Sequence, residues 1–184
     1  KQIPGVEFLG LTTNGVQLAD MASHLYQAGV DGINVSIDTL DNARYAYMTR
    51  RDELRKAIHG LHAALALPFR SVKVNSVLAP DSQPTDWLGV LGLAKEHPVD
   101  VRLIEWMPMA GETDKGGTSA ACALRLIAET YGELTPVPRD IGAGPAHYWQ
   151  APGFMGKFGI IHAMSHSFCD SCNRLRLTAT GNLK

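Results

Sequence analysis

Short apolar runs alternate with stretches of helical periodicity along the first 106 residues, and this alternation constrains the fold most strongly. Strands are predicted over residues 6–11, 32–37, 71–78 and 99–106. Helices are predicted over residues 18–29, 52–67 and 84–95, and a helical stretch with Asp38 and Asp41 as capping candidates ends near Tyr47. Strands that alternate with crossover helices pair in parallel, so the sequence predicts an α/β fold, either a doubly wound sheet or part of a (β/α) barrel.

The composition of the sequence changes after Gly111. Residues 112–118 are polar and rich in glycine, a helix is predicted over residues 119–131, and short strand-like pieces follow among prolines and glycines. We therefore expect a barrel segment over residues 1–110 and a smaller C-terminal lobe over residues 111–184. The sequence starts without Met and stops within a strand-like pattern, so we expect it to be part of a longer protein.

Composition narrows the classes of partner. The 17 Lys and Arg residues and 18 Asp and Glu residues give a net charge of -1, without the basic excess of a nucleic-acid or anionic-membrane binder. No apolar run approaches the roughly 20 residues of a membrane-spanning helix, and the first residues lack the apolar stretch of a signal peptide. We predict a cytoplasmic protein with no nucleic-acid or membrane partner, in which a few local cations bind any anionic ligand.

Polar residues follow several predicted strands, at the carboxyl ends where α/β proteins bind ligands. These candidates are Thr12 to Asn14, Ser36 with Asp38, Asn75, and Glu105 with Met107. Each of them is equally compatible with a role as a turn former or helix cap.

Lys73 and Arg102 differ from these candidates because they lie inside predicted strands. A long cation there costs free energy unless it is paired or reaches solvent or a lumen. Two such cations on neighbouring strands would converge on an anion such as a phosphate. The alternative is a pair of exposed or salt-bridged side chains.

Cys169 and Cys172 form a Cys-x-x-Cys motif, which brings two thiolates to one centre. Such a motif suits zinc, an iron–sulfur cluster or a redox disulfide. A zinc site would need two further ligands, for which His162 and His166 are close enough in sequence. Cys122 lies in an apolar helical stretch and is predicted to be a buried packing residue.

Arg174 and Arg176 alternate in the strand-like stretch that follows the two cysteines, so we expect both side chains on one side. Two guanidinium groups beside a metal centre would bind a triphosphate, or else offset the negative charge of the thiolates. The sequence pattern leaves both readings open.

Taken in order, a series of motifs resembles the radical-SAM GTP 3′,8-cyclase family of molybdenum-cofactor biosynthesis. The motifs are LTTNG at 11–15, VSIDTL at 35–40, MTRR at 48–51, VKVN at 72–75, RLIEWM at 102–107, GPA at 144–146 and residues 168–178. The resemblance covers essentially the whole chain, and the final Cys-x-x-Cys-Asn-Arg-x-Arg makes it specific.

The resemblance implies an incomplete (β/α) radical-SAM barrel with a C-terminal lobe that carries a second iron–sulfur site. One 4Fe-4S cluster would hold S-adenosylmethionine and a second would bind GTP. A 5′-deoxyadenosyl radical would take hydrogen from C3′, which then closes onto C8 to give (8S)-3′,8-cyclo-7,8-dihydroguanosine 5′-triphosphate. The implied partners are an electron donor and a downstream cyclic pyranopterin monophosphate synthase, and a homodimer is compatible with the resemblance.

The family pattern also assigns roles to individual residues. Ser36 and Met107 would bind S-adenosylmethionine, and Cys169 and Cys172 would be ligands of the second cluster. The GTP-binding residues would be Thr12, Lys73, Arg102, Arg174, Leu175 and Arg176. The family's radical-cluster cysteines and the third ligand of its second cluster have no counterpart here, so we expect activity in a longer parent and not in these residues alone.

Three other readings remain open. Another radical-SAM enzyme with an auxiliary cluster would share the barrel but lack the Asn-Arg-x-Arg strand. A non-catalytic zinc module would use Cys169, Cys172 and nearby histidines. A barrel lyase without a cofactor would use Lys73 as a Schiff-base nucleophile.

Overall fold

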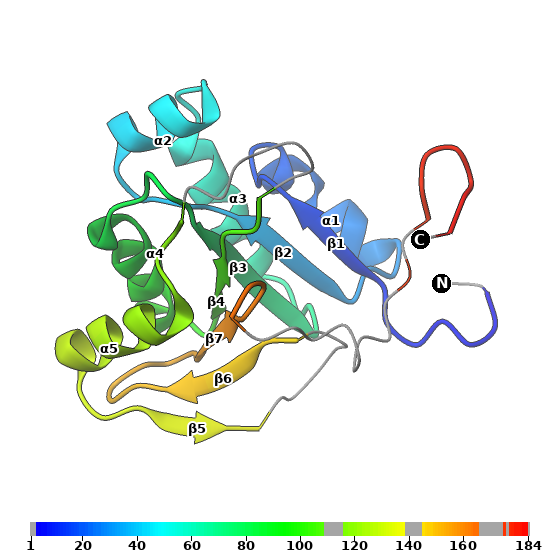
Figure 1. Cartoon of the computed structure of the whole chain (residues 1–184). Helices are drawn as coiled ribbons and strands as arrows, with labels where there is room; N and C mark the ends of the chain where they lie inside the picture. The colour runs from blue at the N-terminus through cyan, green and yellow to red at the C-terminus, as the bar shows by residue number, and fades with distance from the viewer. Residues whose placement is uncertain (1–2, 109–115, 139–144, 166–174, 176, 184) are drawn as a thin grey trace.

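The structure is a computed structural model, and it describes residues 3–108, 116–138, 145–165, 175 and 177–183. Within them, a single sheet has the strand order β1-β2-β3-β4-β7-β6-β5 (Figure 1). The strands are β1 Gly10–Thr13, β2 Gly32–Ser36, β3 Ser71–Leu78, β4 Asp100–Glu105, β5 Thr135–Val137, β6 His147–Gln150 and β7 Phe158–Ile161. The helices are α1 Leu18–Gln27, α2 Asn42–Thr49, α3 Leu54–Leu65, α4 Pro84–Glu96 and α5 Ala120–Tyr131.

The α/β prediction is confirmed. Strands β1 to β4 pair in parallel in chain order, and β7 adds a further parallel strand beside β4. Strands β6 and β5 continue the sheet in antiparallel fashion. The segment after residue 110 therefore contributes strands to the same sheet as the segment before it.

Alternation along the strands separates an apolar face from a polar one. On β3 and β4 the side chains of Val74, Leu78, Val101 and Leu103 are fully buried. They belong to one apolar core together with residues of all the helices, such as the buried Trp87 of α4. The intervening positions make up the opposite face, and they include the polar side chains of Lys73, Asn75, Asp100 and Arg102.

The first strand lies further along the chain than its predicted range of 6–11, because residues 10 to 13 pair with β2. Leu9 lies just before the strand: its N–H donates to the Asp31 carboxylate at 2.8 Å, and its carbonyl accepts from the Asp31 and Gly32 N–H groups. The Phe8 ring covers Gly32, where a Cβ would come within 2.5 Å of it. Thr12 and Thr13 are thus strand residues and not part of a turn.

Helix starts follow the expected capping chemistry with one correction. Asp41 caps α2 by accepting from the Arg44 N–H at 2.8 Å. Asp38, also expected as a cap, instead accepts from the Val77 N–H at 2.8 Å and ties the end of β2 to β3. Burial raises the pKa of Asp38 and outweighs the lowering effect of that hydrogen bond.

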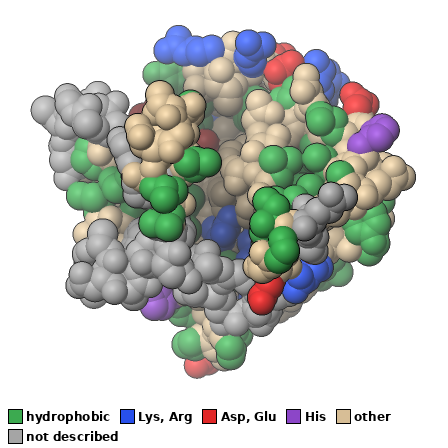
Figure 2. All heavy atoms as spheres, turned by 90° about the vertical axis from the view of Figure 1, so that its right-hand side faces the viewer, with side chains coloured by type: hydrophobic (Ala, Val, Ile, Leu, Met, Phe, Trp, Pro, Cys, Tyr) green, Lys and Arg blue, Asp and Glu red, His purple; other side chains and the backbone are tan. Residues whose placement is uncertain are grey.

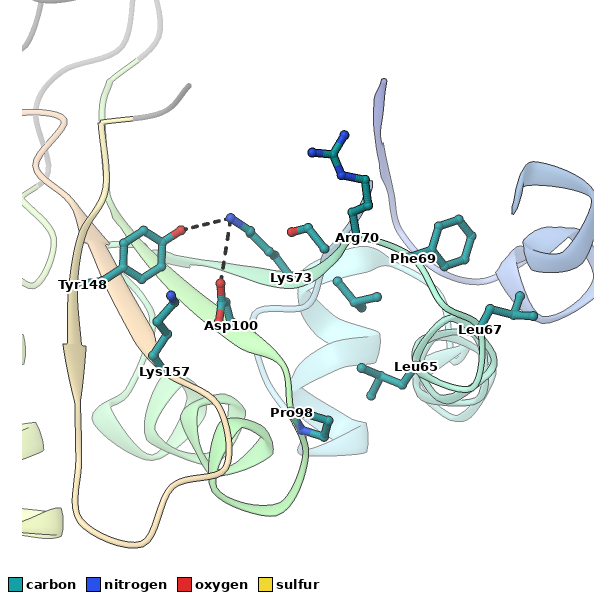
Figure 3. Close-up of a pocket in the computed structure, with 11 residues that line it drawn as sticks. Leu65, Leu67, Phe69, Arg70, Lys73, Pro98, Asp100, Tyr148 and Lys157 are labelled. Carbon is teal, nitrogen blue, oxygen red and sulfur yellow. Dashed lines mark hydrogen bonds and ion pairs between the residues drawn. The ribbon is translucent and has the colours of Figure 1, made fainter. Parts of the chain in front are cut away.

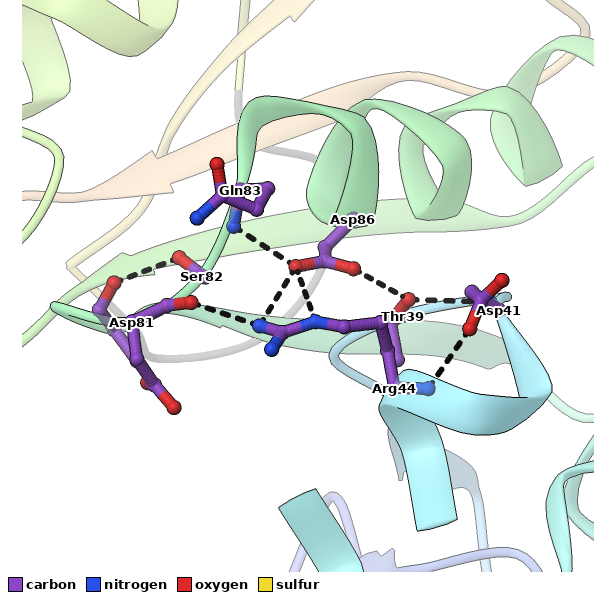
Figure 4. A network of polar contacts seen from close by, with 8 residues as sticks. Thr39, Asp41, Arg44, Asp81, Ser82, Gln83 and Asp86 are labelled. Carbon is purple, nitrogen blue, oxygen red and sulfur yellow. Dashed lines mark hydrogen bonds and ion pairs between the residues drawn. The ribbon is translucent and has the colours of Figure 1, made fainter. Parts of the chain in front are cut away.

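A buried carboxylate joins α2 to the start of α4 (Figure 4). Asp86 accepts hydrogen bonds from the Gln83 N–H, the Thr39 hydroxyl and the Arg44 guanidinium, all between 2.8 and 3.3 Å. Arg44 also donates to the Asp81 carbonyl at 2.8 Å. Burial alone would raise the pKa of Asp86, but these hydrogen bonds outweigh it and lower the pKa below its ordinary value.

None of the described helices is long and apolar enough to cross a membrane.

Candidate functional site

The polar face of the parallel sheet collects side chains from four neighbouring strands. Strand register places Thr12 beside Asn34, Asn34 beside Lys73, and Asn75 beside Arg102. Residues paired in this way point to the same side of a sheet. The two cations that the sequence singled out therefore lie on one face of the sheet.

Amide side chains hold the Arg102 guanidinium in place. Its Nε donates to Asn75 Oδ1 at 2.8 Å, and its Nη2 donates to Asn34 Oδ1 at 2.6 Å. The Asn34 amide in turn donates to Thr12 Oγ1 at 3.4 Å. Both partners of Arg102 are neutral, and no carboxylate in the described ranges forms an ion pair with it. These two amide acceptors therefore orient the half-buried guanidinium.

Lys73 lies on the same face but is buried, with 8% of its surface exposed. Its ammonium is 3.8 Å from Asp100 Oδ2 and 3.4 Å from the Tyr148 hydroxyl (Figure 3). These groups line a pocket of about 330 Å³, together with Arg70 and Lys157. Figure 2, viewed from the right of Figure 1, shows a hollow with Lys or Arg atoms on its floor.

The two residues expected to contact S-adenosylmethionine lie at the other end of the strands. Ser36 is the exposed last residue of β2, and Met107 follows β4 with 54% of its surface exposed. β2 and β4 both pair in parallel with β3, which lies between them. Because each residue is at or beyond the carboxyl end of its strand, both lie at the carboxyl edge of the parallel sheet. Lys73 and Asp100 lie toward the amino ends of their strands, so the pocket and this edge are at opposite ends of the same sheet.

The comparisons with known proteins point to one family. A family model described as Molybdenum Cofactor Synthesis C matches residues 99–184. A GTP 3′,8-cyclase of Moorella thermoacetica is 40% identical over 185 residues, covering 99% of this chain and 57% of the relative. A GTP 3′,8-cyclase of Rhodopirellula baltica is 36% identical over 188 residues, covering 100% and 52%. Human molybdenum cofactor biosynthesis protein 1 is 37% identical over 186 residues, covering 100% and 29%.

The chain is similar to GTP 3′,8-cyclases along its whole length. This confirms the resemblance that its motifs indicated. The chain spans between 29% and 57% of the length of these three relatives. The part matched by the family model begins at the end of α4 and includes β4 to β7, which are the strands that carry Asp100, Arg102 and Tyr148.

Several residues that the cyclase family pattern assigns lie outside the described residues, namely Cys169, Cys172, Arg174 and Arg176. Leu175, also assigned to GTP, is described and is 77% exposed. Within the described ranges, no group of three or more His, Cys, Asp or Glu residues is arranged to hold a metal. Cys122 is half-buried on α5 rather than buried, and its Sγ accepts from Arg125 at 3.9 Å.

Glu105 was a candidate for the ligand site, but it points away from the polar face and accepts hydrogen bonds from two later segments of the chain. Buried to 4% exposure, it accepts from the Ala120 N–H at the start of α5. It also accepts from the Met164 N–H and from the N–H and hydroxyl of Ser165, between 2.9 and 3.0 Å. Burial would raise the pKa of Glu105, but these hydrogen bonds outweigh it and lower the pKa.

Sequence reasoning missed four residues that surround Lys73 and Arg102 in the structure. Asn34 carried a signal, because it alternates with Ser36 on a strand whose other positions are apolar. Asp100, Tyr148 and Lys157 carried none, since the strands that bring them to Lys73 are far apart in sequence.

Proposed function

We propose that this chain forms the GTP-binding part of a radical-SAM GTP 3′,8-cyclase, with residues 1–110 as a barrel segment and 111–184 as a C-terminal lobe. The enzyme would convert GTP to (8S)-3′,8-cyclo-7,8-dihydroguanosine 5′-triphosphate, in the first step of molybdopterin cofactor biosynthesis. The observation that carries the proposal is the oriented Arg102 guanidinium, which shares a sheet face with the pocket around Lys73. Relatives named GTP 3′,8-cyclase support the same reading.

Lys73, Arg102 and Thr12 are proposed to bind GTP from the described part of the site. Arg102 offers a planar fork that matches pairs of phosphate oxygens, and Lys73 offers a compact charge. The Thr12 hydroxyl, held by Asn34, offers a neutral hydrogen-bonding group. Arg174, Leu175 and Arg176 would complete the GTP site from the segment that follows the two cysteines.

The cofactors of the proposal are two 4Fe-4S clusters and S-adenosylmethionine. Ser36 and Met107 fit the latter because both are exposed at one edge of the sheet, as a ligand contact requires. Cys169 and Cys172 supply the soft thiolate donors that an iron–sulfur cluster needs. When bound, the first cluster and S-adenosylmethionine would supply the radical chemistry.

In this proposal the protein's own residues orient the substrate. Fixing the triphosphate at Lys73 and Arg102 would hold the ribose along the strands, toward the edge with Ser36 and Met107. Such positioning lowers the barrier because the reacting atoms are already held close together. Burial of Lys73 would also limit the water that competes for the phosphate.

The proposal includes further partners. An electron donor would reduce the radical cluster, and a cyclic pyranopterin monophosphate synthase would accept the product. The reaction would take place in the cytoplasm, and a homodimer would be compatible with it.

The test is an anaerobic turnover assay with the intact protein, GTP, S-adenosylmethionine and a chemical reductant. We expect the cyclised nucleotide by mass spectrometry and two 4Fe-4S clusters by iron and sulfide analysis, one of them lost in Cys169→Ala. Lys73→Ala should weaken GTP binding roughly tenfold or more, as expected for a lost charge-assisted hydrogen bond. The exposed lysine of Lys95→Ala is the matched control. One zinc per chain without iron would contradict the proposal and favour the zinc module.

A further inference from the structure

Three strands and the residue before β7 converge on the ammonium group of Lys73. Lys73 comes from β3, Asp100 from the start of β4 and Tyr148 from β6. Lys157 immediately precedes β7. Tyr148 reaches Lys73 across the two strands that separate them, and the hydroxyl ends 3.4 Å from the ammonium. Figure 3 shows these side chains directed into one pocket.

Two ammonium groups share the Tyr148 ring. The Nζ of Lys73 is 5.6 Å from the ring centroid, and the Nζ of Lys157 is 5.4 Å from it. A ring attracts a cation to its face through its quadrupole, so Tyr148 draws both lysines toward the pocket. An anion bound in the pocket that both lysines line would be attracted by both ammonium groups.

Among the described residues that line the pocket, three are cations and one is a carboxylate. Arg70 forms an ion pair with Asp31 at 3.6 Å, outside the pocket lining. The two lysines therefore supply the positive charge around Asp100. The pocket favours an anion with several oxygens over a neutral ligand.

Gly159 makes this arrangement of the ring sterically allowed. It pairs with Tyr148 across β6 and β7 and with Arg102 across β7 and β4. A Cβ at Gly159 would lie 2.9 Å from Cε1 of the Tyr148 ring, closer than real Cβ contacts. The ring thus lies over a glycine, in the row of residues that also contains Arg102.

We propose that Lys157 is a second phosphate-binding residue of the GTP site and that Tyr148 is a positioning residue for both lysines. The proposal rests on the proposed function, since it takes the phosphate groups of GTP as the anion. Tyr148 would act through its ring, which attracts both ammonium groups, and through its hydroxyl, which fixes Lys73. Lys157 would contact the phosphate oxygens directly.

The test measures equilibrium binding of GTP, inorganic triphosphate and guanosine to the intact protein by calorimetry. Lys157→Ala should weaken binding of GTP and triphosphate roughly tenfold, as for one charge-assisted hydrogen bond, and leave guanosine binding unchanged. The loss should shrink in 1 M salt because screening weakens a Coulombic contact. Tyr148→Phe, which keeps the ring, should weaken triphosphate binding several-fold with no change in Tm.

Two matched variants keep the outcome interpretable. Lys95→Ala removes an exposed lysine of α4 and sets the background effect of a lost charge. Lys157→Gln keeps the length of the side chain and serves if Lys157→Ala lowers Tm. If Lys157→Ala and Lys157→Gln bind triphosphate as tightly as Lys95→Ala while Lys73→Ala binds it weakly, the inference is wrong and the proposed function stands. If Lys73→Ala also binds GTP normally, both are wrong.

Discussion

Substitution of Glu105 tests how much its hydrogen bonds to α5 and to the segment after β7 stabilise the fold. Its Oε1 accepts one hydrogen bond and its Oε2 accepts three, all from groups in or next to α5 and β7. Glu105→Gln keeps the shape but replaces one acceptor oxygen with a donor. If the amide oxygen takes the position of Oε2, the Ala120 N–H loses its acceptor and the remaining bonds lose their charge.

A lost charge-assisted hydrogen bond and an orphaned buried donor together cost about 2–3 kcal/mol. We therefore expect the free energy of unfolding of Glu105→Gln to fall by that amount at pH 7, measured by urea denaturation of the intact protein. Glu96→Gln, on the exposed end of α4, is the matched control and should change stability by less than about 0.5 kcal/mol.

The pH dependence gives a second check on Glu105. Its pKa is lower in the folded protein, so its stabilisation is complete above the ordinary glutamate pKa of about 4.3 and is lost as pH falls through the folded value. The stability difference between wild type and Glu105→Gln should thus shrink in acid. Equal stability of Glu105→Gln and Glu96→Gln at pH 7 would refute the reasoning.

Three further predictions concern Arg102, Gly60 and Asp86. Arg102→Lys keeps the charge but loses the planar guanidinium that two amides hold in place. Its affinity for GTP, measured by calorimetry, should fall about tenfold. Unchanged affinity would show that the guanidinium geometry is not used. Gly60→Ala places a Cβ 2.1 Å from the Gly15 carbonyl oxygen. Although alanine has the better helix propensity, the free energy of unfolding should fall by about 2 kcal/mol and Tm should fall with it. A raised Tm would contradict this packing. Asp86→Asn removes the charged partner of Arg44 and should lower the free energy of unfolding by about 2 kcal/mol at pH 7, measured by urea denaturation. The loss should be smaller in acid because the pKa of Asp86 is lowered in the folded protein. A loss of stability that does not depend on pH would argue against the ion pair.

The parallel part of the sheet was predictable because local patterns encode it. The β3 range matched its prediction, since a stretch with alternating valines that starts after Arg70 and ends two residues before Pro80 leaves little choice of boundary. The β1 range did not match, because the Phe8 side chain covers Gly32 and the Leu9 backbone binds Asp31, and both contacts are tertiary. The periodicity of residues within one segment carries no information about contacts with residues far away in the sequence.

The same limit applied to the site. Lys73 and Arg102 were predicted from the sequence because a cation within an apolar strand costs free energy unless it is paired or reaches solvent. Tyr148 fits a strand without conflict, and only the placement of β6 beyond β7 brings it to Lys73. Glu105 looked like a ligand residue from its place at a strand end, yet the N–H groups that it binds lie in segments that follow much later.

The pairing of β7 with β4 also bears on how the chain folds. Closing this pair encloses roughly fifty residues in a loop, and the entropy cost of closure rises only slowly with loop length. During synthesis, however, the edge of β4 stays open until the residues of β7 have left the ribosome. An open parallel edge with a buried apolar face behind it is prone to aggregation. Folding of this protein should therefore depend on late, long-range docking, and refolding yield should fall steeply with protein concentration.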